Sequence, residues 1–168
     1  NMKLASGTAP VRDYLDRGIN VALGNDGPPC NNTLDAFTEM RQASLLQKVD
    51  QLDPTVTPAS DIFEMATLNG AKAAGFDELG ALREGWRADI VGLSTDCTRA
   101  TPLHDVLSHL VFAAHGDDVQ FTMVDGTVLQ EDGEVTAIDA DAVRREASEI
   151  GLGMDLAEER RAARQQKP

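Results

Sequence analysis

The residues best suited to chemistry lie in a short polar turn that follows an apolar run. Residues 19–24 are Ile-Asn-Val-Ala-Leu-Gly, and the turn Asn25-Asp26-Gly27 comes directly after them. A short apolar run that is rich in β-branched residues and bounded by glycine is typical of a buried strand. The sequence therefore predicts that Asp26 lies just past the carboxyl end of a strand, where parallel α/β folds carry their active sites.

Asp26 alone permits two interpretations. A carboxylate just past the carboxyl end of a strand lies where parallel α/β folds place their chemistry. Asn-Asp-Gly is also ordinary turn chemistry, because Asn and Asp bond to their own backbone and Gly tolerates positive φ. Taken without the rest of the chain, the turn favours the second, purely structural interpretation.

Helices are expected on both sides of this turn. A short helix begins at Pro10 and ends at Gly18, just before the predicted strand. A longer helix is predicted from about 33 to about 51, with Asn32 as its N-cap. A third is predicted over 57–75, capped by Thr57. The apolar face of the second helix has helical spacing and consists of Phe37, Met40, Ala43, Leu46 and Val49.

The chain after Gly75 is predicted to be richer in strands. Residues 90–93, 119–124 and 127–129 have strand character, and Asp125-Gly126 is a strong hairpin signal between the last two. A helix is expected over 103–114. Residues 139–168 are rich in charge and alanine, which predicts one or two surface helices.

The composition excludes several classes of protein. The net charge is −13, from 28 acidic and 15 basic residues, which argues against nucleic acid as a general partner. The acidic surface indicates either a halophilic protein, adapted to high salt, or an ordinary acidic cytosolic one. No apolar run is long enough to cross a membrane and no signal peptide is visible, so we expect a cytoplasmic protein without a membrane partner.

The cysteines and the N-terminus add two expectations. Cys30 and Cys97 lie far apart and neither belongs to a Cys-x-x-Cys motif, so neither a zinc knuckle nor a disulfide framework is predicted. The chain opens on Asn1-Met2, as if it were cut from something longer.

Six stretches, in this order and spacing, carry a family resemblance over roughly positions 1–130. They resemble the C-terminal part of the amidohydrolase superfamily, in its deaminase and chlorohydrolase branch, which includes methylthioadenosine/S-adenosylhomocysteine deaminases and triazine hydrolases. The matching stretches are residues 1–7, 21–27, 31–35, 65–71, 80–91 and 108–114.

The resemblance implies an α/β fold, with the C-terminal part of a metal-dependent (β/α)8 barrel and part of a small β-sandwich. Residues 1–75 would be the barrel portion, including its last strand. Residues 76–136 would be the sandwich portion, with a helix over 102–115 that packs back on the barrel. Residues 137–168 would form a charged helical tail.

The resemblance also implies a role for Asp26, as both a catalytic residue and a metal ligand. The metal would be zinc, with iron as the alternative. The reaction would be hydrolysis of a carbon–nitrogen bond other than a peptide bond, by deamination of a purine-, pyrimidine- or triazine-like ring. The partner would be this small heterocyclic molecule, and a homo-oligomer is possible.

This sequence departs from the family pattern in its metal ligands. The family's His-x-His pair, its two later metal histidines and its catalytic Glu all lie upstream of the matching stretches. The histidines present here are His104, His109 and His115, in or beside the predicted helix over 103–114. We therefore expect this chain to hold only part of the active site and to be inactive when isolated.

Three further alternatives remain open from the sequence. The chain could be a truncated, inactive relative that serves as a binding or oligomerisation module. It could belong to a chlorohydrolase or N-alkylamine hydrolase of the same fold. Near Asp26, Cys30 lies where the family usually has a serine. Cys30 could be an extra, soft metal ligand, or the substitution could have no role.

Overall fold

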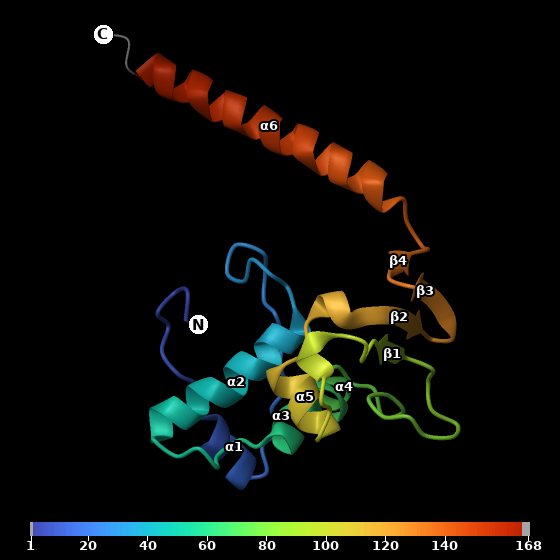
Figure 1. Cartoon of the computed structure of the whole chain (residues 1–168). Helices are drawn as coiled ribbons and strands as arrows, with labels where there is room; N and C mark the ends of the chain where they lie inside the picture. Colours follow the sequence, from blue (N-terminus) through green and yellow to red (C-terminus); the bar gives the residue numbers. More distant parts are fainter. Residues whose placement is uncertain (1, 166–168) are drawn as a thin grey trace.

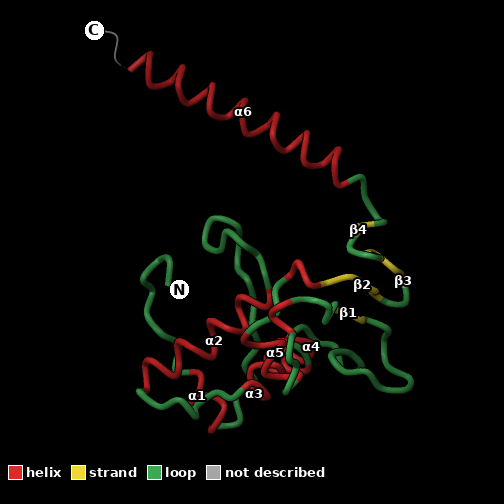
Figure 2. Tube along the Cα trace, in the orientation of Figure 1, coloured by secondary structure: helices red, strands yellow, loops and turns green. Residues whose placement is uncertain are grey.

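The computed structural model describes residues 2–165, with the side chains of α6 described as far as Asp155. The helices of the N-terminal half gather into one body, a sheet lies beside them, and a long helix extends from the sheet (Figures 1 and 2). The α-helices are α1 (Val11–Asp16), α2 (Ala36–Gln51), α3 (Ala59–Ala66), α4 (Leu68–Ala73), α5 (Val106–Phe112) and α6 (Ala140–Gln165). The strands are β1 (Ile90–Leu93), β2 (Val119–Val124), β3 (Thr127–Glu131) and β4 (Glu134–Val135).

The start of α2 differs from the sequence prediction. Its N-cap is Asp35, whose carboxylate accepts the Phe37 N–H at 2.9 Å, so the predicted cap at Asn32 is wrong. Leu34 has a positive φ of 48°, which prevents the helix from beginning before it. The Asn32 side chain is instead bound to the loop, because its Oδ1 accepts Lys3 Nζ at 2.5 Å.

The helix predicted over 57–75 is interrupted. Thr67 has φ −122° and ψ −91° and separates α3 from α4. Its hydroxyl donates to the carbonyl of Phe63 at 2.7 Å, a local bond that competes with a regular helix. Gly75, with a positive φ of 83°, follows the end of α4 as predicted. Thr57 does not cap α3, since the N-cap position is Pro58.

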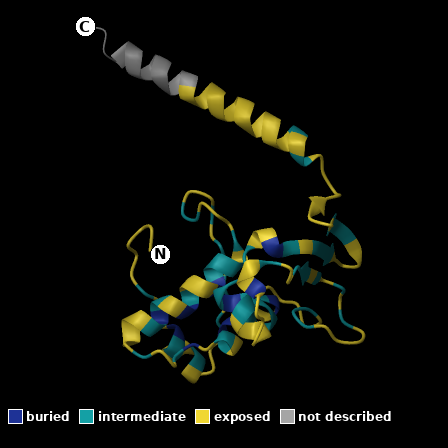
Figure 3. Ribbon diagram, in the orientation of Figure 1, coloured by how far each residue is buried: buried dark blue, intermediate teal, exposed yellow. Residues whose placement is uncertain are grey.

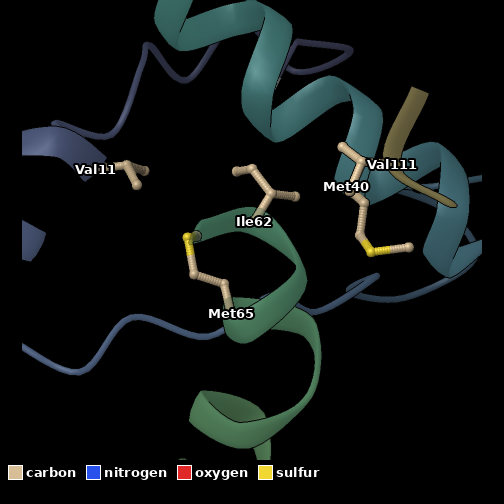
Figure 4. Packing of buried hydrophobic residues seen from close by; sticks show 5 residues of the cluster. All are labelled: Val11, Met40, Ile62, Met65 and Val111. Atoms are coloured by element: carbon tan, nitrogen blue, oxygen red, sulfur yellow. The ribbon is translucent and has the colours of Figure 1, made fainter. Parts of the chain in front are cut away.

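The apolar core joins α1, α2, α3 and α5. Ile62 and Met65 on α3 are fully buried, and Val111 on α5 is 1 % exposed. Figure 4 shows them with Val11 and Met40, which reach the same cluster from α1 and α2. Because these five side chains come from four helices, their burial fixes the helices relative to one another. Most of the buried residues lie inside this helical body, while the sheet and the described side chains of α6 are largely half-buried or exposed (Figure 3).

The inner face of α2 is more polar than its spacing predicts. Gln47 is 2 % exposed, and its side chain donates to the carbonyl of Ala9 at 2.8 Å. Ser44 is fully buried and donates to the carbonyl of Thr57 at 2.9 Å. Val49 is 71 % exposed, so its predicted place on the buried face is wrong. These bonds satisfy the buried polar groups and tie α2 to the loops before α1 and α3.

Residues 19–24 are not a strand in the described structure, and that prediction is wrong for this chain as it stands. The segment is irregular. Its link to α3 is a bond from the Leu23 N–H to the carbonyl of Met65, at 3.2 Å. A strand requires a ladder of bonds to a neighbouring strand, and the described residues place none beside this segment.

The strands form one antiparallel sheet in the order β1-β2-β3-β4. β2 and β3 are joined through Asp125 and Gly126, which both have positive φ, at 48° and 77°, as the predicted hairpin turn requires. A second turn of the same kind, at Asp132-Gly133, adds β4, which the sequence prediction did not include. The described residues thus give a single four-stranded sheet; the barrel and the second sheet of a sandwich remain predictions.

The helix predicted over 103–114 is shorter, because Asp105 caps it by accepting the Ser108 N–H at 2.6 Å. This α5 packs against α2 and α3. The tail forms one long helix, α6; the last predicted tail residues, 166–168, lie outside the described residues.

Asp118 connects the start of β2 to the loop after β1. It is 6 % exposed, forms an ion pair with Arg99, and accepts the His115 N–H at 2.9 Å. Burial by itself would raise the pKa of Asp118, but the bonds from His115 and Arg99, together with the charge of Arg99, outweigh it and hold the pKa below its usual value. The ionised form of Asp118 is therefore favoured in the folded chain.

We expect the Asp118–Arg99 ion pair to stabilise the fold at neutral pH and to lose this effect at acid pH. A depressed pKa contributes stability that is present above the unfolded-state pKa, about 4, and is lost as the pH falls through the lower folded-state pKa. Asp118→Asn should reduce the free energy of unfolding by about 1–2 kcal/mol at pH 7, measured by urea denaturation, and by less at about pH 3. Asp125→Asn is the control, since its pair with Arg87 is 3.6 Å long and exposed. An equal loss of unfolding free energy at both pH values would show that the stabilisation does not come from the ionised carboxylate of Asp118.

Candidate functional site

Asp26 occupies the tip of the turn after the extended segment. Its backbone has a positive φ of 57°, a left-handed conformation that Asp tolerates better than most residues. The carboxylate is exposed, whereas Val21 and Leu23 before it are half-buried against the helical core. The burial of alternate residues thus anchors the segment and leaves Asp26 accessible to a ligand.

The chain after Asp26 is folded into a rigid loop. The N–H groups of Cys30 and Asn31 both donate to the carbonyl of Gly27, each at 2.9 Å. Lys3 crosses over from the N-terminal loop and donates to the carbonyl of Pro29 at 2.8 Å. With Pro28 and Pro29 limiting φ, these bonds fix the turn without help from a sheet.

The turn borders an open depression of about 550 Å³. Its lining comes from the N-terminal loop, the segment 21–26, the loop 30–33 and α2, with Val11 and Met65 contributing apolar surface. Glu39 of α2 lines the same depression and accepts a hydrogen bond from the side chain of Asn31. Glu39 is not among the site residues predicted from the sequence, because a glutamate in the first turn of a helix is most simply explained by the helix dipole.

One polar atom near Asp26 has no bonding partner. The side-chain nitrogen of Asn25 is buried and makes no hydrogen bond among the described residues. A buried amide without a partner costs free energy, so such a group is usually paired in a complete structure. Asn25 lines the depression beside Asp26. The described chain therefore leaves one buried hydrogen-bond donor on this side of the site without an acceptor.

Cys30 lies next to Asp26 in the turn. A hydrogen bond to the Asp26 carboxylate raises the pKa of the Cys30 thiol, with partial burial and the negative charge of Asp26 acting in the same direction and Lys3 opposing. The thiol therefore stays protonated at neutral pH. Both Cys30 and Cys97 are free.

The histidines lie away from Asp26. His104 is in the exposed loop before α5, so its predicted place on the helix is wrong; His109 is on α5, and His115 precedes β2. Among the side chains that the structure describes, which end at Asp155, no three His, Cys, Asp or Glu residues come together as a metal site. The carboxylate of Asp26 suits one position of a zinc site, which needs about three protein ligands and an open position, but the described residues do not complete the set.

Comparison with known proteins shows the family of this chain. Residues 1–129 match the amidohydrolase family. The chain belongs to the amidohydrolase family. It is 50 % identical over 147 residues to a 5'-deoxyadenosine deaminase of Methanosarcina mazei, covering 88 % of this chain and 34 % of that protein. It is 48 % identical over 149 residues to a 5-methylthioadenosine/S-adenosylhomocysteine deaminase of Haloarcula marismortui, with 89 % and 34 % covered.

Solved structures of amidohydrolases support the same assignment. A zinc-bound adenosine deaminase of Xanthomonas campestris superimposes with a TM-score of 0.86 at 36 % identity, over 89 % of this chain and 34 % of that one. An atrazine chlorohydrolase of Arthrobacter aurescens, complexed with zinc and atraton, gives 0.78 at 29 % identity, over 88 % and 33 %. The family resemblance predicted from the sequence is thus confirmed. The chain spans about a third of the length of the curated relatives it matches.

The described part of the chain contains no helix that is both long and apolar enough to cross a membrane.

Proposed function

We propose that this chain is the C-terminal part of a metal-dependent aminohydrolase that removes an amino group from an adenine-type ring by hydrolysis. The observation that carries the proposal is the exposed carboxylate of Asp26, held on a rigid turn beside an open depression, in a chain about half identical to 5'-deoxyadenosine deaminases. Zinc in the solved relatives supports zinc as the metal.

In this proposal the chain's own residues prepare one side of the site. Asp26 supplies one negatively charged oxygen ligand and a base that can accept a proton from water and return it to the leaving nitrogen. Lys3 and the Gly27 carbonyl hold the turn, so the carboxylate keeps its position when a ligand arrives. A divalent metal, when bound, lowers the pKa of water and so supplies a nucleophile at neutral pH.

The remaining ligands are proposed to come from residues beyond this chain. We accordingly expect the isolated chain to be inactive. The non-enzymatic alternative, a binding or oligomerisation module, predicts the same inactivity, and only the completed protein separates the two.

A second reaction is favoured by one observation. An atrazine chlorohydrolase superimposes with a TM-score of 0.78, so release of chloride or an alkylamine from a triazine-like ring is the alternative chemistry. The higher identity to deaminases, 50 % against 29 %, favours release of ammonia.

The test compares the 168-residue chain with a longer polypeptide that restores the length of its relatives, both supplied with zinc. We expect the longer protein to release ammonia from 5'-deoxyadenosine and the short chain to release none. Release of ammonia by the short chain would refute the proposal that its active site is incomplete. Chloride release from atrazine without deamination would favour the second chemistry, and inactivity of the longer protein on both substrates would favour the non-enzymatic module.

A further inference from the structure

Glu39 of α2 bonds directly to the loop that follows Asp26. This loop projects from the start of α2 (Figure 1), and most of its residues are exposed. Glu39 is half-buried in the first turn of the helix and lines the depression. Its carboxylate accepts a hydrogen bond from the side-chain nitrogen of Asn31, eight residues earlier in the chain. The contact therefore joins an exposed loop to a helix of the apolar core.

Asn31 connects this contact to the backbone of the turn. Its N–H donates to the carbonyl of Gly27 at 2.9 Å, and Gly27 directly follows Asp26. Its side-chain oxygen accepts the N–H and the hydroxyl of Thr33, at 3.3 Å and 3.0 Å. Because both ends of the Asn31 amide are bound, the orientation of its side chain is fixed. A rigid path of contacts thus leads from Glu39 through Asn31 to Gly27 and Asp26.

Glu39 is better anchored than Lys3, which bonds to the same loop from the N-terminal side. Met40, next to Glu39, is 4 % exposed and belongs to the apolar core. Lys3 belongs to residues 2–7, which are all exposed. A partner with little conformational freedom of its own restricts a loop more than a mobile partner does, because less ordering is needed when the bond forms. The helix α2 is therefore the fixed reference for the turn.

We propose that Glu39 is a positioning residue, which holds the Asp26 carboxylate at the edge of the depression through Asn31 and Gly27. Its part in the reaction rests on the proposed function of Asp26, whereas its hold on the turn does not. A displacement of a reacting group by about 1 Å can lower a rate about a hundredfold. Loss of the Glu39 contact should therefore affect kcat more than KM.

The first experiment measures hydrogen exchange at single backbone amides of the 168-residue chain by NMR. Glu39→Leu should speed exchange about tenfold at Cys30 and Asn31, whose N–H groups donate to the Gly27 carbonyl. Glu39→Gln should keep both rates within about threefold of the wild type, because the oxygen of Gln still accepts the Asn31 side chain. Gln42→Ala is the matched control, since Gln42 is an exposed residue of the same helix that lines the same depression, and it should change neither rate.

Three outcomes of this experiment would overturn the hold on the turn. Unchanged exchange in Glu39→Leu would show that the contact restrains nothing. Equal acceleration in Glu39→Gln and Glu39→Leu would show that Glu39 acts by its charge at the start of the helix. Equal acceleration at Leu23, whose N–H donates to the carbonyl of Met65, would show that Glu39 stabilises the whole helical body.

The second experiment measures ammonia release from 5'-deoxyadenosine by a polypeptide that restores the length of the relatives. Glu39→Leu should lower kcat about ten- to a hundredfold with KM within about threefold, and Glu39→Gln should recover most of the loss. Glu39→Leu combined with Asn31→Ala should lower kcat no further than the stronger single change, because both remove one contact.

The wild-type polypeptide separates failure of the positioning role from failure of the proposed function. If the wild type is active and Glu39→Leu keeps its kcat within threefold, the positioning role is wrong and the proposed function stands. Losses that add in the double variant would overturn the path through Asn31. A wild type without activity would refute the proposed function and, with it, the part of Glu39 in the reaction, while the exchange rates would still decide whether Glu39 holds the turn.

Discussion

Asp26→Asn should lower the kcat/KM for deamination by about a thousandfold or more in a polypeptide that restores the length of the relatives. The change keeps the size of the side chain and removes its negative charge. An amide oxygen binds a divalent metal less strongly than a carboxylate, and an amide accepts no proton from water at neutral pH. The measurement is ammonia release with saturating zinc, together with the zinc content of the purified protein.

Asp132→Asn provides the control for this experiment. Asp132 is also exposed and also sits in a turn with positive φ, 49° against 57° at Asp26, but in the hairpin between β3 and β4. The substitution should leave turnover unchanged. If Asp26→Asn retained activity within tenfold of the wild type, Asp26 would be a turn residue and the structural interpretation would stand. Cys30→Ser, assayed beside it, should leave the zinc content unchanged if Cys30 is not a ligand.

Gly80→Ala should destabilise the chain by about 3 kcal/mol, measured as the free energy of unfolding in urea. Gly80 has a positive φ of 91°, and a Cβ atom there would lie 2.8 Å from the carbonyl oxygen of Thr67 and 2.9 Å from the Cα of Leu68. Both contacts are with backbone at the break between α3 and α4. Neither can move aside without disturbing the helix that carries Ile62 and Met65 into the core.

Gly85→Ala separates the two causes of the stability loss at Gly80, which are the left-handed backbone and the close contacts of the added Cβ atom. Gly85 has a similar positive φ of 83°, but a Cβ atom would meet nothing within 4 Å. It should therefore show only the cost of the left-handed conformation, about 1 kcal/mol. Equal losses at the two positions would show that close packing against the α3–α4 break contributes nothing.

Features that depend on a few neighbouring residues could be predicted from the sequence. The turn at Asp125-Gly126, the exposed turn at Asp26 and the helix stop at Gly75 were all predictable, because left-handed backbone selects for Gly, Asn and Asp wherever it occurs. The buried position of Met40 on α2 followed from helical spacing. The order and spacing of six short stretches were enough to predict the family.

The partners of these elements depend on how the whole chain folds, and they could not be predicted from local sequence. Residues 19–24 have the composition of a strand, yet they form none here, because a strand is made by bonds to another strand and local preference cannot supply them. Asp35, not Asn32, caps α2, and the Asn32 side chain instead accepts a hydrogen bond from Lys3, far away in the sequence. Glu39 faces the same depression as Asp26 because α2 packs beside the turn. Such long-range contacts leave no local pattern in the sequence, whereas turns and helical spacing depend on residues that are close together in the chain.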